Sequence, residues 1–106
     1  MVHLVDTVEV EPQHVAAYLE VVRTVGMGIM TDAGASFVSC ATTSSEIGEH
    51  VFIQVVWAVG DHERWNEIRR DLVLDPRFHE YGSTVAALRV GGTRRFFTAA
   101  ALAPPP

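Results

Sequence analysis

The sequence predicts a single α+β domain with the element order β-α-β-β-α-β, and three observations support this prediction. Residues 51–59 contain one polar side chain, Gln54, in an otherwise apolar run that is typical of a buried strand. Apolar residues at helical spacing both precede and follow this run. The length of 106 residues suffices for one hydrophobic core but not for two.

The first half of the chain predicts a strand, a helix and a second strand. Residues 3–10 alternate in polarity as a strand does. Pro12 suits the first turn of the helix that follows, and the sequence 32–34, Asp-Ala-Gly, ends it. Residues 35–43 form the second predicted strand. The apolar stripe of the helix consists of Val15, Tyr18, Leu19, Val22 and Val25.

The second half predicts a strand, an interrupted helix and a final strand. Residues 51–59 are the third strand, and Asp61 is the expected N-cap of the helix. Pro76 interrupts this helix, because the residue before a proline avoids helical angles. The apolar side of its first part comprises Trp65, Ile68, Leu72 and Val73, and that of its second part Phe78, Tyr81, Val85 and Leu88. We expect a turn at residues 91–92 and the fourth strand at 93–100.

This order of elements is the split βαβ arrangement of ferredoxin-like folds, with a four-stranded antiparallel sheet. Two helices cover one face of such a sheet, so the other face needs a second partner. Exposing apolar side chains there would cost about 25 cal/mol per Å². We therefore expect a homodimer that encloses a pocket. The domain spans residues 1–100, and a disordered Pro-rich tail occupies residues 101–106.

The composition excludes several classes of function. The net charge is −5 and all eight basic residues are arginine, so no basic cluster predicts nucleic-acid binding and no lysine can form a Schiff base. A lone cysteine, Cys40, excludes an internal disulfide. The start of the sequence lacks the pattern of a signal peptide, and no apolar run is long enough to span a membrane. We expect a cytoplasmic protein.

Three short segments resemble a known family. Residues 10–12, Val-Glu-Pro, end the first strand; Asp-His-Glu-Arg at 61–64 follows the strand that holds Trp57; and Asp-Pro-Arg-Phe occupies 75–78. Together with the element order, they resemble the dimeric α+β barrel superfamily, and within it the NIPSNAP-like group, from about Val2 to Phe97. The first strand differs from the usual Glu-x-Arg pattern of that group, because alignment on Pro12 places Leu4 and Asp6 there.

The resemblance implies a small-molecule ligand and a homodimer, and it leaves three functions open. The first is a cofactor-independent isomerase, cyclase, dehydratase or lyase that uses acid/base chemistry on a small, apolar, carbonyl-bearing substrate. The second is a haem-binding protein or a cofactor-free monooxygenase. The third is a ligand-binding barrel without catalysis. Fold alone does not choose among them.

Asp6 is the first candidate for catalysis. If its side chain faces the barrel, its neighbours on the same strand face, Leu4 and Val8, are apolar. A carboxyl group alone among aliphatic side chains has a raised pKa and serves as a general acid or base near neutral pH. The alternative is an ion pair with Arg94 or Arg95 on a neighbouring strand.

His79 is the second catalytic candidate, as a proton relay at the mouth of the pocket or as a haem ligand. No histidine pair has metal-ligand spacing, so we expect no metal and no cofactor for the acid/base reaction.

An aromatic and aliphatic wall would suit a flat apolar substrate. The predicted substrate-binding residues are Trp57, Phe37, Leu4, Val8, Ile53, Val55, Trp65 and Tyr81.

Overall fold

A computed structural model describes residues 1–44 and 48–102 of the chain. It confirms the predicted order, with strand ends within about two residues of those expected. The predicted tail falls largely on residues 103–106, which lie outside the described residues. The elements are β1 (Val2–Val10), η1 (Pro12–His14), α1 (Val15–Val21), η2 (Val22–Gly26), α2 (Met27–Ala33), β2 (Ser36–Thr42), β3 (Val51–Gly60), α3 (His62–Leu74), α4 (Pro76–Leu88) and β4 (Gly91–Thr98).

The four strands form one antiparallel sheet in the order β2-β3-β1-β4. This is the ferredoxin-like topology, in which the two central strands, β1 and β3, each come from a different βαβ half. The pairing register places Asp6 beside Val55 of β3 on one side and beside Arg94 of β4 on the other. Because paired residues of an antiparallel sheet share a face, these three side chains point in the same direction.

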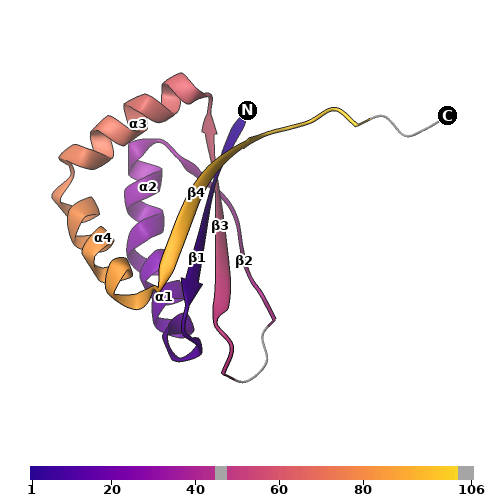
Figure 1. Cartoon of the computed structure of the whole chain (residues 1–106). Coiled ribbons are helices and arrows are strands. Elements are labelled where there is room, and N and C mark those ends of the chain that lie inside the picture. Colours follow the sequence, from indigo (N-terminus) through magenta and orange to yellow (C-terminus); the bar gives the residue numbers. More distant parts are fainter. Residues whose placement is uncertain (45–47, 103–106) are drawn as a thin grey trace.

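All the helices lie on one face of the sheet (Figure 1). The core fills the space between the two layers, and alternate residues of the central strands supply its sheet side. Leu4 and Ile53 are both 0% exposed, and Ile68 of α3, which belongs to the same core, has the same exposure. Among the described residues no helix has the length and apolar character that a membrane crossing would require.

The opposite face of the sheet carries no helix in the described part of the chain, and Figure 1 shows it open. The sequence of β3 predicted a strand that is buried on both faces. Within the chain only one face is covered, since Trp57 is 3% exposed whereas Phe52, on the other face, is 46% exposed. The homodimer that would cover this face stays a prediction.

The first helical region is continuous from Pro12 to Ala33 but is not uniform. It includes the π-helical turn η2, which has more residues per turn than an α-helix and so rotates the side chains that follow it. Val25 was expected on the apolar stripe and is 42% exposed, because it lies in this turn. Gly34 ends the region with a φ of 112°, a left-handed conformation that favours glycine.

Two further sequence predictions are wrong in detail. Val73 was expected on the buried side of α3 but is 55% exposed, because α3 already buries Leu72 and the next residue is turned away by about 100°. Residues 91–92 were expected to form a turn. Gly91 and Gly92 instead begin β4, where they pair with β1, and the chain turns before them.

Candidate functional site

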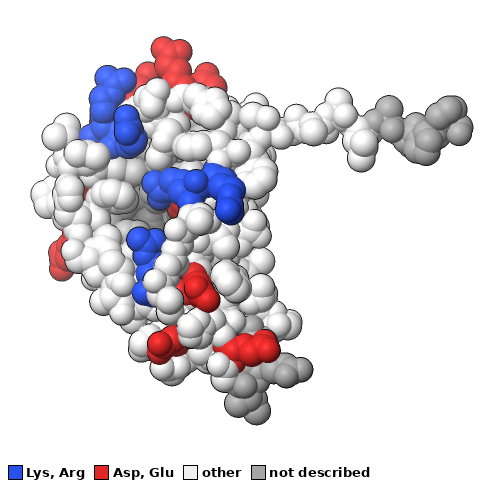
Figure 2. Space-filling view, in the orientation of Figure 1, with Lys and Arg blue, Asp and Glu red and all other residues white. Residues whose placement is uncertain are grey.

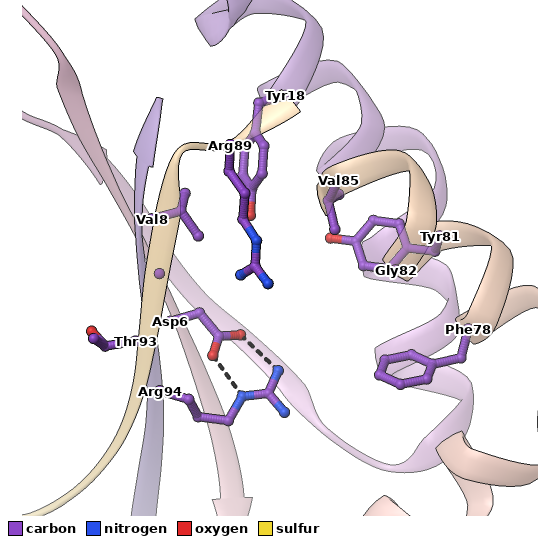
Figure 3. A pocket seen from close by; sticks show the side chains of 11 residues that line it. Asp6, Val8, Tyr18, Phe78, Tyr81, Gly82, Val85, Arg89, Thr93 and Arg94 are labelled. Atoms are coloured by element: carbon purple, nitrogen blue, oxygen red, sulfur yellow. Dashed lines mark hydrogen bonds and ion pairs between the residues drawn. The ribbon is translucent and has the colours of Figure 1, made fainter. Parts of the chain in front are cut away.

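A cavity of about 410 Å³ lies between the sheet and the helix layer and opens beside β4. Its volume falls within the usual range for sites that bind small molecules. Figure 2 shows a hollow on this side of the molecule, with arginine side chains (blue) around it, and Figure 3 shows the interior. The cavity is lined by Asp6, Val8, Tyr18, Phe78, Tyr81, Gly82, Val85, Arg89, Gly92, Thr93 and Arg94.

Asp6 lies in the wall of this cavity and forms a two-point ion pair with Arg94. Arg94 Nε donates to Oδ1 of Asp6 at 2.7 Å, and Nη2 donates to Oδ2 at 3.1 Å. The Asp6 side chain is 23% exposed. The expectation of a lone carboxyl group among aliphatic side chains is therefore wrong, and the ion-pair alternative is confirmed. The cause is the register of β1 with β4, which sets the two residues side by side.

Arg94 also lies over the ring of Trp65, with its guanidinium carbon 5.3 Å from the ring centroid. This cation–π contact and the bidentate ion pair hold the guanidinium in one plane. Trp65 in turn packs edge-on against Phe96 at a centroid distance of 5.7 Å. The orientation of Asp6 thus depends on packing that extends from β4 to α3.

Two tyrosine hydroxyls face the cavity from the helix layer. Tyr18 comes from α1 and Tyr81 from α4, and their hydroxyls approach each other beside Arg89 (Figure 3). Burial raises the pKa of both phenols, and the charge of Asp6 contributes in the same direction. Both groups therefore stay protonated at neutral pH. They are suited to donate hydrogen bonds to a substrate oxygen and unsuited to remove a proton.

Arg89 follows the last residue of α4 and sends its guanidinium into the cavity (Figure 3). Among the described residues, no hydrogen bond or ion pair holds this side chain, in contrast to Arg94. The absence of a side chain at Gly92 makes room for it, because a Cβ atom there would lie 2.8 Å from Nη1 of Arg89. The same Cβ would lie 3.1 Å from Cγ1 of Val8.

The predicted substrate-binding residues fall partly in the cavity wall and partly in the surrounding core. Val8 and Tyr81 line it, and a small cavity of about 40 Å³ behind Asp6 brings in Val55 and Trp57. Leu4 and Ile53 are completely buried in the core. Trp65 makes the cation–π contact with Arg94. Phe37, on the edge strand β2, packs edge-on against Trp57 with a distance of 5.8 Å between the ring centroids.

His79 is exposed on α4 and is not among the residues that line the cavity. Its Nε2 lies 2.6 Å from the carbonyl oxygen of Val73, across the junction of α3 and α4. The structure therefore does not bring His79 together with Asp6. Within residues 1–44 and 48–102 there is no group of three or more His, Cys, Asp or Glu side chains that could hold a metal ion.

Sequence reasoning missed Arg89 and gave no special place to Tyr18. The signal for Tyr18 was its position on the apolar stripe, where a hydroxyl needs a polar surrounding or an opening. Arg89 had no comparable signal, since an arginine after a helix is common at the surface. Only the return of β4 against β1 places it over the sheet.

Comparisons with known proteins agree with the fold. No protein-family model matches the sequence, and no curated protein matches it. An uncharacterized NIPSNAP domain protein from Burkholderia xenovorans superposes with a TM-score of 0.79 over 99% of this chain and 100% of its own, at 23% identity. The chain has a NIPSNAP-like fold. The resemblance predicted from the three sequence segments is thereby confirmed at the level of fold.

The NIPSNAP-like fold is shared with oxygenases of the α+β barrel type. SnoaB, a cofactor-independent oxygenase from Streptomyces nogalater, has a TM-score of 0.62 and 19% identity over 98% of this chain and 97% of its own. A monooxygenase from the gene ActVA-Orf6 of Streptomyces coelicolor, in complex with the ligand nanaomycin D, has a TM-score of 0.63 and 19% identity over 99% and 92%. At such identities the likeness concerns the fold.

Proposed function

We propose that this protein is a cofactor-independent enzyme that removes a proton from carbon in a small, largely apolar, carbonyl-bearing molecule, and that the resulting anion reacts with dioxygen. The observation that carries the proposal is the convergence of a carboxylate, two protonated phenols and two guanidinium groups in one cavity of about 410 Å³. The oxygenases with the same fold support dioxygen as the second reactant.

Asp6 is the proposed base. Of its two oxygens, Oδ2 has the longer bond to Arg94, 3.1 Å against 2.7 Å for Oδ1, and is the one more easily released to accept a proton. Arg94 keeps the carboxylate oriented throughout and compensates its charge while it is ionised. Because the cavity also has apolar walls, such as Val8 and Phe78, a flat hydrophobic substrate can lie between the sheet and α4.

Tyr18 and Tyr81 are the proposed donors to the carbonyl oxygen. As the proton leaves carbon, negative charge develops on that oxygen as an enolate. A hydrogen bond from a fixed, protonated phenol stabilises this charge more than it stabilises the neutral ketone. The raised pKa of each phenol keeps the donor proton in place during the reaction.

Anthrone is a suitable probe, because it is flat, carries one carbonyl group and has an acidic methylene group. The expected reaction with dioxygen gives anthraquinone and water. Both methylene C–H bonds break, one oxygen atom enters the new carbonyl group, and the other leaves as water. The rate of anthraquinone formation is measured by absorbance, and dioxygen uptake is followed with an oxygen electrode.

General acid–base catalysis typically contributes about 100-fold or more, so Asp6→Asn is expected to lose at least that factor in kcat/KM. Tyr18→Phe and Tyr81→Phe keep their rings and report the loss of one donor each. Asp71→Asn is the control, since Asp71 is an exposed carboxylate on the outer helix α3. Wild-type protein that does not exceed the spontaneous rate, or Asp6→Asn that equals the wild type, would refute the proposal.

The same assay without dioxygen tests the second candidate, an isomerase or related enzyme in which the proton returns to carbon. The observation that favours it is the same carboxylate, because proton return needs no other reactant than the base itself. Faster exchange of the methylene protons with deuterated water, followed by NMR, combined with no oxidation in air, would assign the protein to this class.

A further inference from the structure

The cavity holds a positive charge that the proposed proton transfer does not use. Two arginines and one carboxylate are the charged residues that line it, and Arg94 is already paired with Asp6. Dashed lines in Figure 3 join these two side chains, and none reaches Arg89. Within the described residues the guanidinium of Arg89 therefore has no anionic partner, because the one carboxylate in the cavity, Asp6, is paired with Arg94.

We infer that Arg89 binds a carboxylate group of the substrate, so that the substrate class is a small aromatic or alicyclic carboxylic acid. This inference rests on the proposed function, because it names the substrate of the same cavity. A guanidinium is planar and presents two parallel N–H groups that match a carboxylate. The formal charge of the lining residues, +1, corresponds to a ligand with one negative charge.

The position of the Arg89 guanidinium depends on the glycine at position 92 of β4. Gly92 has no Cβ atom, and a Cβ atom would come within 2.8 Å of Nη1 of Arg89 and 3.3 Å of the carbonyl oxygen of Thr7. Any larger residue at position 92 would push the guanidinium away from the wall formed by Val8. The glycine thus fixes where the carboxylate binds, which is on the sheet side of the cavity.

The groups around Arg89 favour a carboxylate over a second basic or neutral partner. Tyr18 and Tyr81 face it from the helix layer and stay protonated, so they offer donors and no negative charge. Asp6 faces the same space from β1 but is held by Arg94. An incoming carboxylate would meet a free guanidinium and two hydroxyl donors, whereas the chain as a whole, with a net charge of −5, repels anions.

The test is a binding measurement by isothermal titration calorimetry on the full chain at low salt. The probes are 2-naphthoate and the neutral ketone 2-acetonaphthone, which have the same ring system. We expect the wild type to bind 2-naphthoate about tenfold or more tightly than the ketone, as one charge-assisted hydrogen-bonded pair implies. Arg89→Gln should remove this preference and leave the affinity for the ketone within about twofold, since the apolar walls remain.

Arg95→Gln is the matched control. Arg95 is another arginine of β4, but it pairs with Val5, and its side chain lies on the opposite face of the sheet from the cavity. It should bind both probes as the wild type does. Gly92→Ala provides a second variant that keeps Arg89 but displaces it, and it should weaken binding of 2-naphthoate more than binding of 2-acetonaphthone. Equal affinity of the wild type for both probes, or a preference that survives in Arg89→Gln, would overturn the inference.

The outcome is separable from that of the anthrone assay, because anthrone has no carboxylate. Turnover of anthrone without a preference for 2-naphthoate would keep the proposed function and overturn the carboxylate site. A preference that depends on Arg89, without turnover of anthrone, would keep the carboxylate site and contradict the proposed reaction.

Discussion

The contact between Gly26 and Tyr81 gives the sharpest prediction about stability. Gly26 is the last residue of the π-helical turn η2, and the ring of Tyr81 packs directly on it. A Cβ atom at position 26 would lie 2.6 Å from the Tyr81 hydroxyl oxygen and 2.7 Å from Cζ. Gly26→Ala therefore forces the phenol ring to move. Gly28, two residues later in the same helical region, has no atom within 4 Å of the corresponding position.

The two substitutions have the same backbone effect and different packing effects. Alanine in place of glycine in a helix stabilises by about 0.5–1 kcal/mol. Overpacking costs about 1–3 kcal/mol, and Gly26→Ala should be near the lower end because Tyr81 borders cavities on either side into which its ring can turn. The free energy of unfolding of Gly26→Ala should therefore be about 1–2 kcal/mol lower than that of Gly28→Ala.

The assay is urea unfolding followed by circular dichroism, with thermal unfolding as a second measure. For a chain of this size a difference of 1 kcal/mol corresponds to about 4–8 °C in Tm. Gly26→Ala should also weaken binding in the cavity, since Tyr81 lines it, whereas Gly28→Ala should not. In the Tyr81→Leu background the cost of Gly26→Ala should be smaller than in the wild type, because the atoms in conflict are removed.

Equal stabilisation by the two alanines would refute this reasoning, because it would mean that the ring of Tyr81 does not rest on Gly26. A destabilised Gly26→Ala whose binding in the cavity is unchanged would separate the packing role of Tyr81 from its place in the site. An equal cost of Gly26→Ala in the Tyr81→Leu background and in the wild type would locate the conflict elsewhere.

Two further predictions concern the phenols and the open face of the sheet. Because the folded pKa of Tyr18 and Tyr81 lies above the ordinary value of 10.0, their contribution to stability is present below pH 10.0 and is lost as the pH rises toward the folded pKa. In a pH titration, tyrosinate absorbance should thus appear at higher pH in folded protein than in urea-unfolded protein, and coincident curves would contradict this. The chain has no lysine and only these two tyrosines, so the titration is simple to assign. The Phe52→Glu variant, which puts a charge on the open face of the sheet, should dissociate the expected homodimer. The control Leu74→Glu should not, because Leu74 is 81% exposed on the helix layer. Sedimentation velocity measures the oligomeric state, and a monomeric wild type would contradict the prediction.

The sequence determined the order of the secondary-structure elements and which of their side chains share a face. Alternation correctly placed Leu4, Asp6 and Val8 on one face of β1, and the interruption at Pro76 was predicted at the right residue. The expectation that this face of β1 is turned toward the barrel is wrong, because the structure turns it toward the helix layer. These features depend on side-chain periodicity and local backbone preference, which act between residues close in the chain. Where a local irregularity intervened, as in the π-helical turn at Val25, the same periodicity gave a wrong face.

The candidate site was decided by tertiary structure. Asp6 and Arg94 are 88 residues apart, and only the register of β4 on β1 selects Arg94 over Arg95 as the partner. A shift of one residue that set Arg95 opposite Asp6 would exchange the faces of the two arginines and make Arg95 the partner of Asp6. Arg89 and Tyr81 belong to the site because α4 lies over β1 and Gly92 leaves room, and no local pattern encodes either fact. Sequence periodicity thus determined which side chains share a face, while the tertiary structure determined which face the helices cover and the long-range strand register determined which charges meet.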